Sequence, residues 1–319
     1  MSSVIEELRR RAAGRSRRIL LPETQDPRVL ESASLLHQQN LAIPVVLARR
    51  DCPNRDALGG LEVIECDDSQ LVDACAQQLF ENRQHKGLSL EAAIEAVRDP
   101  LLYAALLVKI GAVDGAVAGS VASTSSVIRA ALHGVGMAEG CKTVSSFFLM
   151  QFPERAVTFS DCGVVPNPDA RQLAEIAISA AESHRILTGQ IPRVALLSFS
   201  TLGSAEHDEV DKVRQALGLV KQWQPGLMVD GEMQFDSAWV PEVAARKAPG
   251  SPVAGQANVF IFPDLNSGNI AYKIAERLGG AQALGPLIQG LQRPFMDLSR
   301  GCQVQDIVDV AVIASNLAV

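Results

Sequence analysis

Short apolar runs rich in β-branched residues alternate with longer helical patterns along the whole chain, and this alternation constrains the fold more than any other feature. Strands that are apolar on both faces and are separated by helices are typical of a parallel sheet with helices on each side. The predicted fold class is therefore α/β. The predicted strands cover residues 19–21, 43–48, 61–65, 115–118, 194–198, 227–229 and 259–262.

Helix starts are indicated by a capping side chain followed by proline. Asp99-Pro100 predicts a helix through Ile110, and Asn167-Pro168 predicts another that runs to about Leu187. A last helix is expected over residues 304–317.

The chain length favours two domains, because 319 residues are about twice a typical domain. A composition of 47% hydrophobic and 20% charged residues supports a sizeable core and excludes wholesale disorder. The apolar segment 142–152 follows a glycine-containing stretch at 134–140, so we place the first boundary near residue 140. The last helix is expected to return to the first domain.

Charge and cysteine usage exclude several classes of protein. The 29 Lys and Arg against 36 Asp and Glu give a net charge of -7, the wrong sign for a general nucleic-acid binder. No apolar run approaches the ~20 residues that span a bilayer. The cysteines form no C-x-x-C pair, so a reduced cytosolic protein without a zinc site is expected. They are Cys52, Cys66, Cys75, Cys141, Cys162 and Cys302.

The arginine-rich N-terminus, with Arg9 to Arg11 and Arg15, has two interpretations. An ordinary surface helix is favoured over a targeting or encapsulation segment, because Glu6 and Glu7 are atypical of import sequences.

Familiar catalytic and nucleotide-binding motifs are missing. The stretch 134–140 carries Glu139 where a dinucleotide fingerprint needs glycine, and no histidine lies in a metalloprotease or serine-triad pattern. Cys162 is a weaker candidate nucleophile, because no histidine lies beside it.

Four loops of glycine and small hydroxyl residues lie at predicted strand-to-helix junctions: 119–126, 198–204, 266–269 and 297–301. A single loop of this composition usually only forms a tight turn. Four such loops together predict a site where helix N-termini and hydroxyl groups bind an anion. Arg129 and Arg300 can add bidentate phosphate contacts. Asp306 can face the same anion site and act there as a base. An acidic residue in the first turn of a helix is also stabilised by the helix dipole, so this position has a structural explanation as well.

The chain resembles the phosphate acetyl/butyryltransferase family over nearly its full length. The matching stretches are LPETQDPR, STSSVIRAAL, FSDCGVVPNP, LLSFSTLGSA, VDGEMQFD, FPDLNSGNIAYKIAERLGG and GPLIQGLQRPFMDLSRGC. The segment 51–60 is where a difference in length is expected. The short form is also similar to the version associated with ethanolamine breakdown, which would allow a cytoplasmic enzyme to lie in a bacterial microcompartment.

The resemblance implies two three-layer α/β/α domains with mainly parallel sheets, as in isocitrate and isopropylmalate dehydrogenases, with the active site in the interdomain cleft. The domains are expected over 1–140 plus 290–319, closed by the C-terminal helix, and over 141–289. A homodimer is the usual state. The implied reaction is reversible acetyl transfer between acetyl phosphate and coenzyme A (CoA), with CoA as a substrate and with no cofactor or metal.

The resemblance also assigns site residues. Ser299, Arg300 and Asp306 match the catalytic positions, Arg129 the phosphate-contacting arginine and Arg83 a further substrate-binding arginine. Hydroxyl, amide and backbone donors of the loops are expected to contact substrate. These residues are Ser123, Thr124, Ser200, Thr201, Gly203, Ser204, Asn266 and Gly268.

The chemistry of the residues agrees with this assignment. A thiol with a pKa near ~8.5 is mostly protonated at neutral pH, so its attack on an acyl carbon needs a base. We expect Asp306 to be that base, strengthened by burial or acting in concert with attack. Ser299 would orient the thiol, and Arg300 and Arg129 would hold the phosphoryl oxygens. Direct transfer is favoured over a covalent acyl-enzyme, because no activated nucleophile is evident.

Three alternatives remain open at this point. The acyl preference could be butyryl, because one methylene changes binding by only ~1 to 3 kcal/mol. The chain could be a non-catalytic acyltransferase-like interaction module. It could also be a metal-dependent decarboxylating dehydrogenase of similar architecture, which nicotinamide-cofactor binding would reveal.

Overall fold

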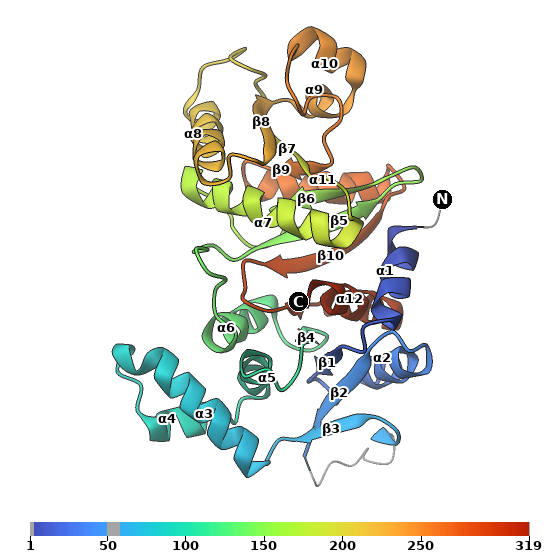
Figure 1. The fold of residues 1–319 in the computed structure, drawn as a ribbon, viewed down its shortest axis with the longest axis vertical. Helices are drawn as coiled ribbons and strands as arrows, with labels where there is room; N and C mark the ends of the chain where they lie inside the picture. The colour runs from blue at the N-terminus through green and yellow to red at the C-terminus, as the bar shows by residue number, and fades with distance from the viewer. Residues whose placement is uncertain (1–2, 50–57, 319) are drawn as a thin grey trace. The chain divides into compact units, whose positions relative to one another are not determined.

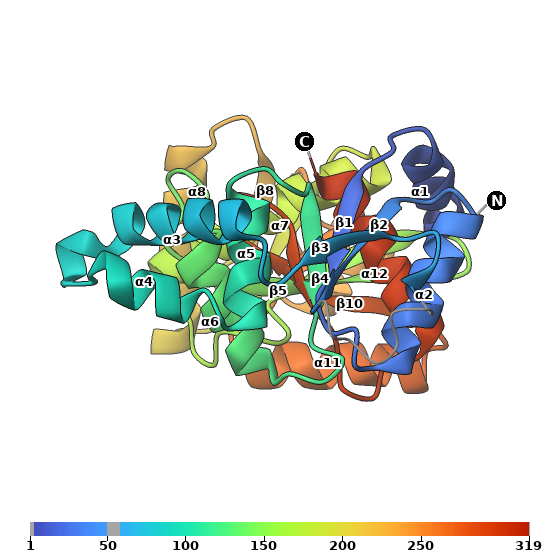
Figure 2. The same ribbon diagram turned by 90° about the horizontal axis from the view of Figure 1, so that it is seen from below.

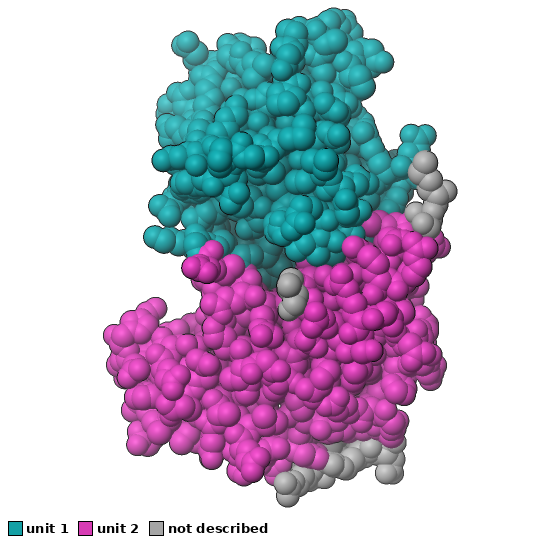
Figure 3. Space-filling model, in the orientation of Figure 1, with its two compact units in different colours: residues 1, 140–290 teal, residues 2–139, 291–319 magenta. Residues whose placement is uncertain are grey.

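The computed structural model describes residues 3–49 and 58–318 of the chain. The chain divides into two compact units (Figure 3): unit 1 comprises residues 140–290, and unit 2 comprises residues 2–139 and 291–319. Cys52 and most of the segment 51–60, where a length difference is expected, lie outside the described residues.

The sheet of unit 2 has five strands in the order β11-β4-β1-β2-β3, and every neighbouring pair is parallel. All its strands therefore end at one edge, where the loops that follow them meet. The strands are β1 (Arg18–Leu21), β2 (Ile43–Ala48), β3 (Glu62–Glu65), β4 (Gly115–Ala118) and β11 (Phe295–Asp297). Figure 1 labels β1, β2, β3 and β4 of this sheet.

Helices cover both faces of this sheet (Figure 2). One layer holds α1 (Val4–Ala13), α2 (Pro27–Gln38) and α12 (Val304–Leu317), and the other holds α3 (Ser69–Arg83), α5 (Pro100–Lys109) and α6 (Thr124–Gly134). The short η2 (Gln84–Lys86) and α4 (Leu90–Ala96) follow α3.

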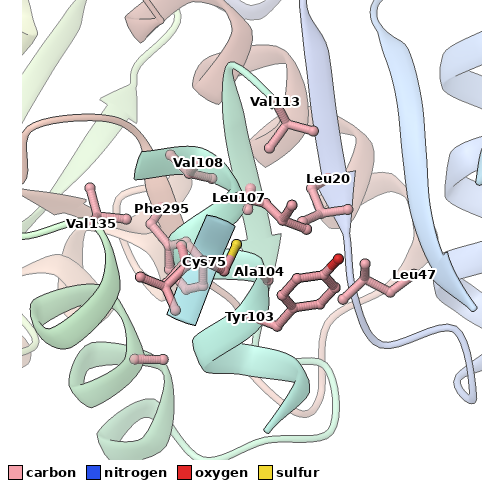
Figure 4. Close-up of a cluster of buried hydrophobic side chains, with 14 of the residues drawn as sticks. Leu20, Leu47, Cys75, Tyr103, Ala104, Leu107, Val108, Val113, Val135 and Phe295 are labelled. Carbon is pink, nitrogen blue, oxygen red and sulfur yellow. The ribbon is translucent and has the colours of Figure 1, made fainter. Parts of the chain in front are cut away.

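The core on the α3 and α5 side is apolar and closely packed (Figure 4). Leu20 and Leu47 from the sheet meet Tyr103 and Leu107 from α5 and Cys75 from α3, each no more than 2% exposed. This packing fixes the outer layer of helices against the strands.

The sheet of unit 1 has six strands in the order β10-β5-β6-β9-β7-β8. The β10-β5 and β5-β6 pairs are antiparallel, and the other three pairs are parallel. The strands are β5 (Ser145–Gln151), β6 (Ala156–Ser160), β7 (Arg193–Leu197), β8 (Met228–Met233), β9 (Val259–Ile261) and β10 (Gln282–Gln289).

Helices again lie on both faces. The helices α7 (Ala170–Thr188) and α8 (Asp208–Trp223) pack on one face of the sheet of unit 1. The other face is covered by α9 (Phe235–Trp239) and α11 (Leu265–Arg277), and α10 (Pro241–Lys247) packs against α9.

The predicted α/β class with mainly parallel sheets is confirmed. The predicted helix start at Asp99 and the predicted last helix over 304–317 are also confirmed. The start at Asn167 was wrong: Asp169 caps α7 and forms a capping box with Gln172. Strands β5, β6, β10 and β11 were not predicted, although the segment 142–152 was recognised as apolar. β10 contains Gly-Pro and β11 has only three residues, which weakens the local strand pattern.

The two ends of the chain pack together within unit 2. Ile5, Leu8 and Ala12 of α1 are buried, and the side chain of Asn316 donates to the carbonyl of Leu8 at 3.0 Å. Arg9 and Asp309 form an ion pair at 2.6 Å. Over 3–49 and 58–318, no helix is long and apolar enough to cross a bilayer.

Candidate active site

The loop that carries Ser299 and Arg300 leaves the carboxyl end of β11 and leads into α12. The N–H of Leu298 donates to the Ala118 carbonyl at 2.8 Å, which fixes the start of the loop beside β4. A turn follows, in which the Cys302 N–H donates to the Ser299 carbonyl at 2.9 Å. The side chains of Ser299 and Arg300 are exposed at the carboxyl edge of the sheet.

Asp306 lies in the first turn of α12, three residues after the N-cap residue Gln303. Its Oδ2 accepts the N–H of Gln303 at 2.8 Å, and within the described chain no hydrogen bond reaches its other oxygen. The side chain of Asp306 is exposed in the described chain.

The loop after β4 does not offer its backbone donors to a ligand, as the predicted anion site required. The buried carboxylate of Glu23 accepts the N–H groups of Gly119, Ser120, Val121 and Ala122 at 2.7 to 3.3 Å, and the Ser120 hydroxyl at 3.0 Å. This protein carboxylate therefore takes the place that we expected a substrate anion to fill.

Ser123 and Thr124 begin α6 directly after this loop. The Ser123 hydroxyl caps the helix by accepting the Ser126 N–H at 3.2 Å, while Thr124 is exposed. Asp297 is 1% exposed, and its Oδ1 has no hydrogen-bond partner. Burial is the main cause that raises the pKa of Asp297 to about 6, helped by the nearby charge of Glu23.

Arg28 connects the two loops. Its guanidinium donates to the carbonyls of Arg300 and Cys302 at 3.1 and 2.6 Å and to the carbonyl of Ser120 at 3.1 Å. The Asp26 carboxylate accepts from the same group at 2.7 Å, and this hydrogen bond is the main reason that the pKa of Asp26 is lowered.

Arg83 is the last residue of α3, and Arg129 lies in the middle of α6. The positive charges of both arginines and of Lys86 repel a proton on His133 of α6. Burial first, and then these three positive charges, lower the pKa of His133. Unit 2 thus brings two predicted arginines together and adds Lys86, which the sequence reasoning missed.

In unit 1 the loop 198–204 turns its predicted donors inward. Glu232, 2% exposed, accepts the Ser200 hydroxyl at 2.7 Å and the Gly203 N–H at 2.9 Å, and pairs with Arg214 at 2.9 Å. Although burial opposes it, these hydrogen bonds, from Arg214 above all, lower the pKa of Glu232. The donors of Ser200 and Gly203 are therefore occupied by Glu232 and hold the loop in place.

The neighbouring hydroxyls also serve the loop. Thr201 is buried, and its N–H donates to the exposed Ser204 hydroxyl at 3.0 Å. The Thr201 hydroxyl lies 3.3 Å from that of Ser237. Thr201 is consequently turned away from solvent, whereas Ser204 stays at the surface.

The segment 266–269 lies in the first turns of α11, next to the end of β6. Asn266 is exposed, but Gly268 is buried against the backbone carbonyl of Asp161, where a Cβ atom would come within 2.2 Å of the oxygen. Asp161 accepts the N–H groups of Gly163, Val164 and Val165 at 2.7 to 3.3 Å. Gly268 thus has a packing role that its spacing did not reveal.

Besides Lys86, the sequence did not indicate the roles of Glu23, Asp26, Arg28 and Glu232. All four lie within stretches that carried the family resemblance, and Asp26-Pro27 is itself a helix-start signal, with Asp26 accepting the Arg28 N–H. Spacing alone does not show that Arg28 and Glu23 reach loops about a hundred or more residues away.

In the described part of the chain, no group of three potential metal ligands occurs, and no disulfide joins its five cysteines. Cys162 is fully buried, and burial together with the Asp161 charge raises the pKa of its thiol, which disfavours the reactive thiolate.

Comparisons with known proteins agree with the predicted family. The model of the phosphate acetyl/butaryl transferase family matches residues 3–315. The phosphate acetyltransferase of Paracoccus denitrificans is 46% identical, with 98% of each chain covered, and that of Acetivibrio thermocellus is 45% identical, with 98% of this chain and 97% of the relative covered.

Solved structures show the same similarity. The EutD phosphotransacetylase from Staphylococcus aureus superposes with a TM-score of 0.93 at 37% identity, and each chain is covered completely. The match of the family model to nearly every residue, together with relatives of this identity and coverage, shows that the chain belongs to the phosphate acetyl/butaryl transferase family.

Proposed function

We propose that the chain is a phosphate acetyltransferase that reversibly transfers an acetyl group between acetyl phosphate and CoA. The observation that carries this proposal is the full-length similarity to enzymes of that name. The exposed Ser299 and Arg300 beside Asp306 at one sheet edge support it, because this chemistry needs an oriented thiol, a cation and a base.

The proposed reaction has one bond-forming step. The sulfur of CoA attacks the carbonyl carbon of acetyl phosphate, the C–O bond to phosphate breaks, and the thiol proton passes to the free carboxylate oxygen of Asp306. Ser299 orients the sulfur. An exposed carboxylate is a weak base, so proton transfer accompanies attack instead of preceding it.

The arginines act on the phosphate groups. Arg300 holds the phosphoryl oxygens and stabilises the negative charge that the leaving phosphate acquires. Arg129 also contacts phosphate, and Arg83 binds substrate beside it. Their shared position near His133 supports this assignment, because a cluster of cations suits a polyanionic substrate such as CoA.

We also propose that the enzyme is a cytoplasmic homodimer. Ile270, Ile274 and Leu278 form an exposed apolar stripe along α11 at helical spacing, and such a stripe favours self-association. The packing of α1 against α12 supports an ordinary structural helix at the arginine-rich N-terminus over a targeting segment.

Thioester formation from acetyl phosphate and CoA, with and without a chelator, tests the proposal. We expect chelator-insensitive turnover that falls by about 10² to 10⁴ in Asp306→Asn and by about 10² or more in Arg300→Ala. Arg98→Ala, which removes an exposed ion pair with Glu95, serves as the control and should retain full turnover.

The same preparations should sediment as dimers. Rates with propionyl and butyryl phosphate determine the acyl preference. A folded dimer without turnover on any of the three acyl phosphates would refute the proposal that the chain is an enzyme. It would favour a non-catalytic interaction module.

A further inference from the structure

Arg28 is the one described side chain whose hydrogen bonds reach both loops at the carboxyl edge of unit 2 from a third element, the start of α2. The contacts are to main-chain carbonyls, of Ser120 on one loop and of Arg300 and Cys302 on the other. Main-chain contacts hold the path of a loop and leave its side chains free for a ligand.

The guanidinium uses all five of its N–H donors. Nη1 donates to Arg300 and Cys302, Nη2 to Ser120 and Asp26, and Nε to the Asp26 carboxylate at 3.1 and 3.2 Å. A lysine has three donors on a point-like ammonium and cannot reproduce this planar pattern.

The local sequence places the group rigidly. Asp26 caps α2 by accepting the Arg28 N–H at 3.0 Å, and Pro27 occupies the first helical position. The same carboxylate braces the guanidinium, so the direction of Arg28 is tied to the helix start. The single proton of the Ser32 hydroxyl is shared between the Arg28 carbonyl at 2.6 Å and the Val304 carbonyl at 3.1 Å, so Ser32 links the start of α12 to α2.

We propose that Arg28 is a positioning residue, which aligns the Ser299–Arg300 loop with the loop that leads to Thr124 and Arg129. It acts through the backbone of both loops and does not contact the reacting atoms. Its effect on turnover rests on the proposed acetyl transfer, in which displacements of about 1 Å can cost ~10²-fold in rate.

The experiment compares Arg28→Ala with Arg17→Ala. Arg17 is a matched control, because its side chain is 31% exposed against 32% for Arg28 and it also pairs with an aspartate, Asp114. The Arg17 pair lies at the amino ends of β1 and β4, at the opposite edge of the same sheet. Both variants lose one arginine–aspartate ion pair, in which the aspartate is 6% exposed for Arg28 and 28% exposed for Arg17, but only Arg28→Ala loses the link between the loops.

We expect kcat of Arg28→Ala to fall by about 10²-fold, with smaller changes in KM for either substrate. Added guanidinium ion should restore part of the turnover of Arg28→Ala, whereas Arg28→Lys should stay impaired. Arg17→Ala should keep the wild-type kcat. A merely structural role would lower the stability of both arginine-to-alanine variants without a kcat defect that guanidinium rescues.

Hydrogen exchange of the amides in 119–123 and 299–303 provides a readout that does not depend on activity. Exchange should quicken in Arg28→Ala and stay unchanged in Arg17→Ala. Unchanged exchange in Arg28→Ala, or faster exchange with normal kcat in an active enzyme, would overturn the inference. If the wild type forms no thioester, the proposed function fails, and hydrogen exchange still decides whether Arg28 orders the loops.

Discussion

Buried carboxylates take the place that substrate anions were expected to fill. Glu23 in unit 2 and Glu232 in unit 1 each receive the donors of a glycine- and serine-rich loop that follows a neighbouring strand. The residue types that suggest phosphate binding, small hydroxyls and free N–H groups, are equally those that a buried carboxylate needs. At this scale sequence patterns cannot separate the two roles.

Asp297 should make stability depend on pH, because its pKa is raised to about 6 in the folded chain from an ordinary value near 4. Below pH ~4 the carboxyl is protonated in both states. As pH rises towards 6 the unfolded chain loses this proton first, so the folded state loses up to about 3 kcal/mol of stability.

Asp297→Asn keeps the shape and abolishes the titration. Its unfolding free energy relative to wild type should therefore increase by up to about 3 kcal/mol between pH 4 and 7. Urea denaturation at several pH values in this range measures the difference. A difference that is independent of pH would show that Asp297 does not titrate there.

Individual elements show where local patterns succeed. α12 and α5 were predicted correctly because their ends and apolar faces are local signals. The start of α7 was misplaced because Asn167 and Asp169 can both cap, and only the structure shows the capping box with Gln172. The contacts of Glu23 and Arg28 join positions 92 to 274 residues apart, which no local pattern encodes.

Two helical glycines should respond oppositely to alanine. In Gly268→Ala the new Cβ would meet the Asp161 carbonyl oxygen at 2.2 Å, so α11 must move, at a cost of about 1 to 3 kcal/mol. Gly218 in α8 has no atom within 4 Å of that position, so Gly218→Ala should stabilise by about 0.5 to 1 kcal/mol. Chemical denaturation measures both, and equal effects would contradict the packing role of Gly268.

At the scale of the molecule, unit 1 is one continuous segment, whereas unit 2 is assembled from both ends of the chain. β11 pairs with β4, and α12 supplies buried residues beside β1, β4 and α1. The α/β class and the family could be predicted from sequence, since both depend on patterns that span the whole chain.

This arrangement predicts different behaviour for the two fragments. Residues 140–290 should fold alone with a cooperative thermal transition. Residues 2–139 should not, because the absence of β11 and α12 exposes the sheet face and one strand edge. Near-ultraviolet circular dichroism during heating checks both, and adding residues 291–319 to the second fragment should restore its signal. A cooperative transition in 2–139 alone would contradict the prediction.

The two buried glutamates also have an evolutionary consequence. Because Glu23 and Glu232 hold their loops from beneath, the shape of each loop does not depend on the side chains it presents to solvent, such as Val121, Phe199 and Leu202. Those outward positions can drift, and so retune what the loops recognise, while the inherited backbone stays in place. Selection can thus alter the outward surface of these loops by single substitutions without rebuilding the scaffold.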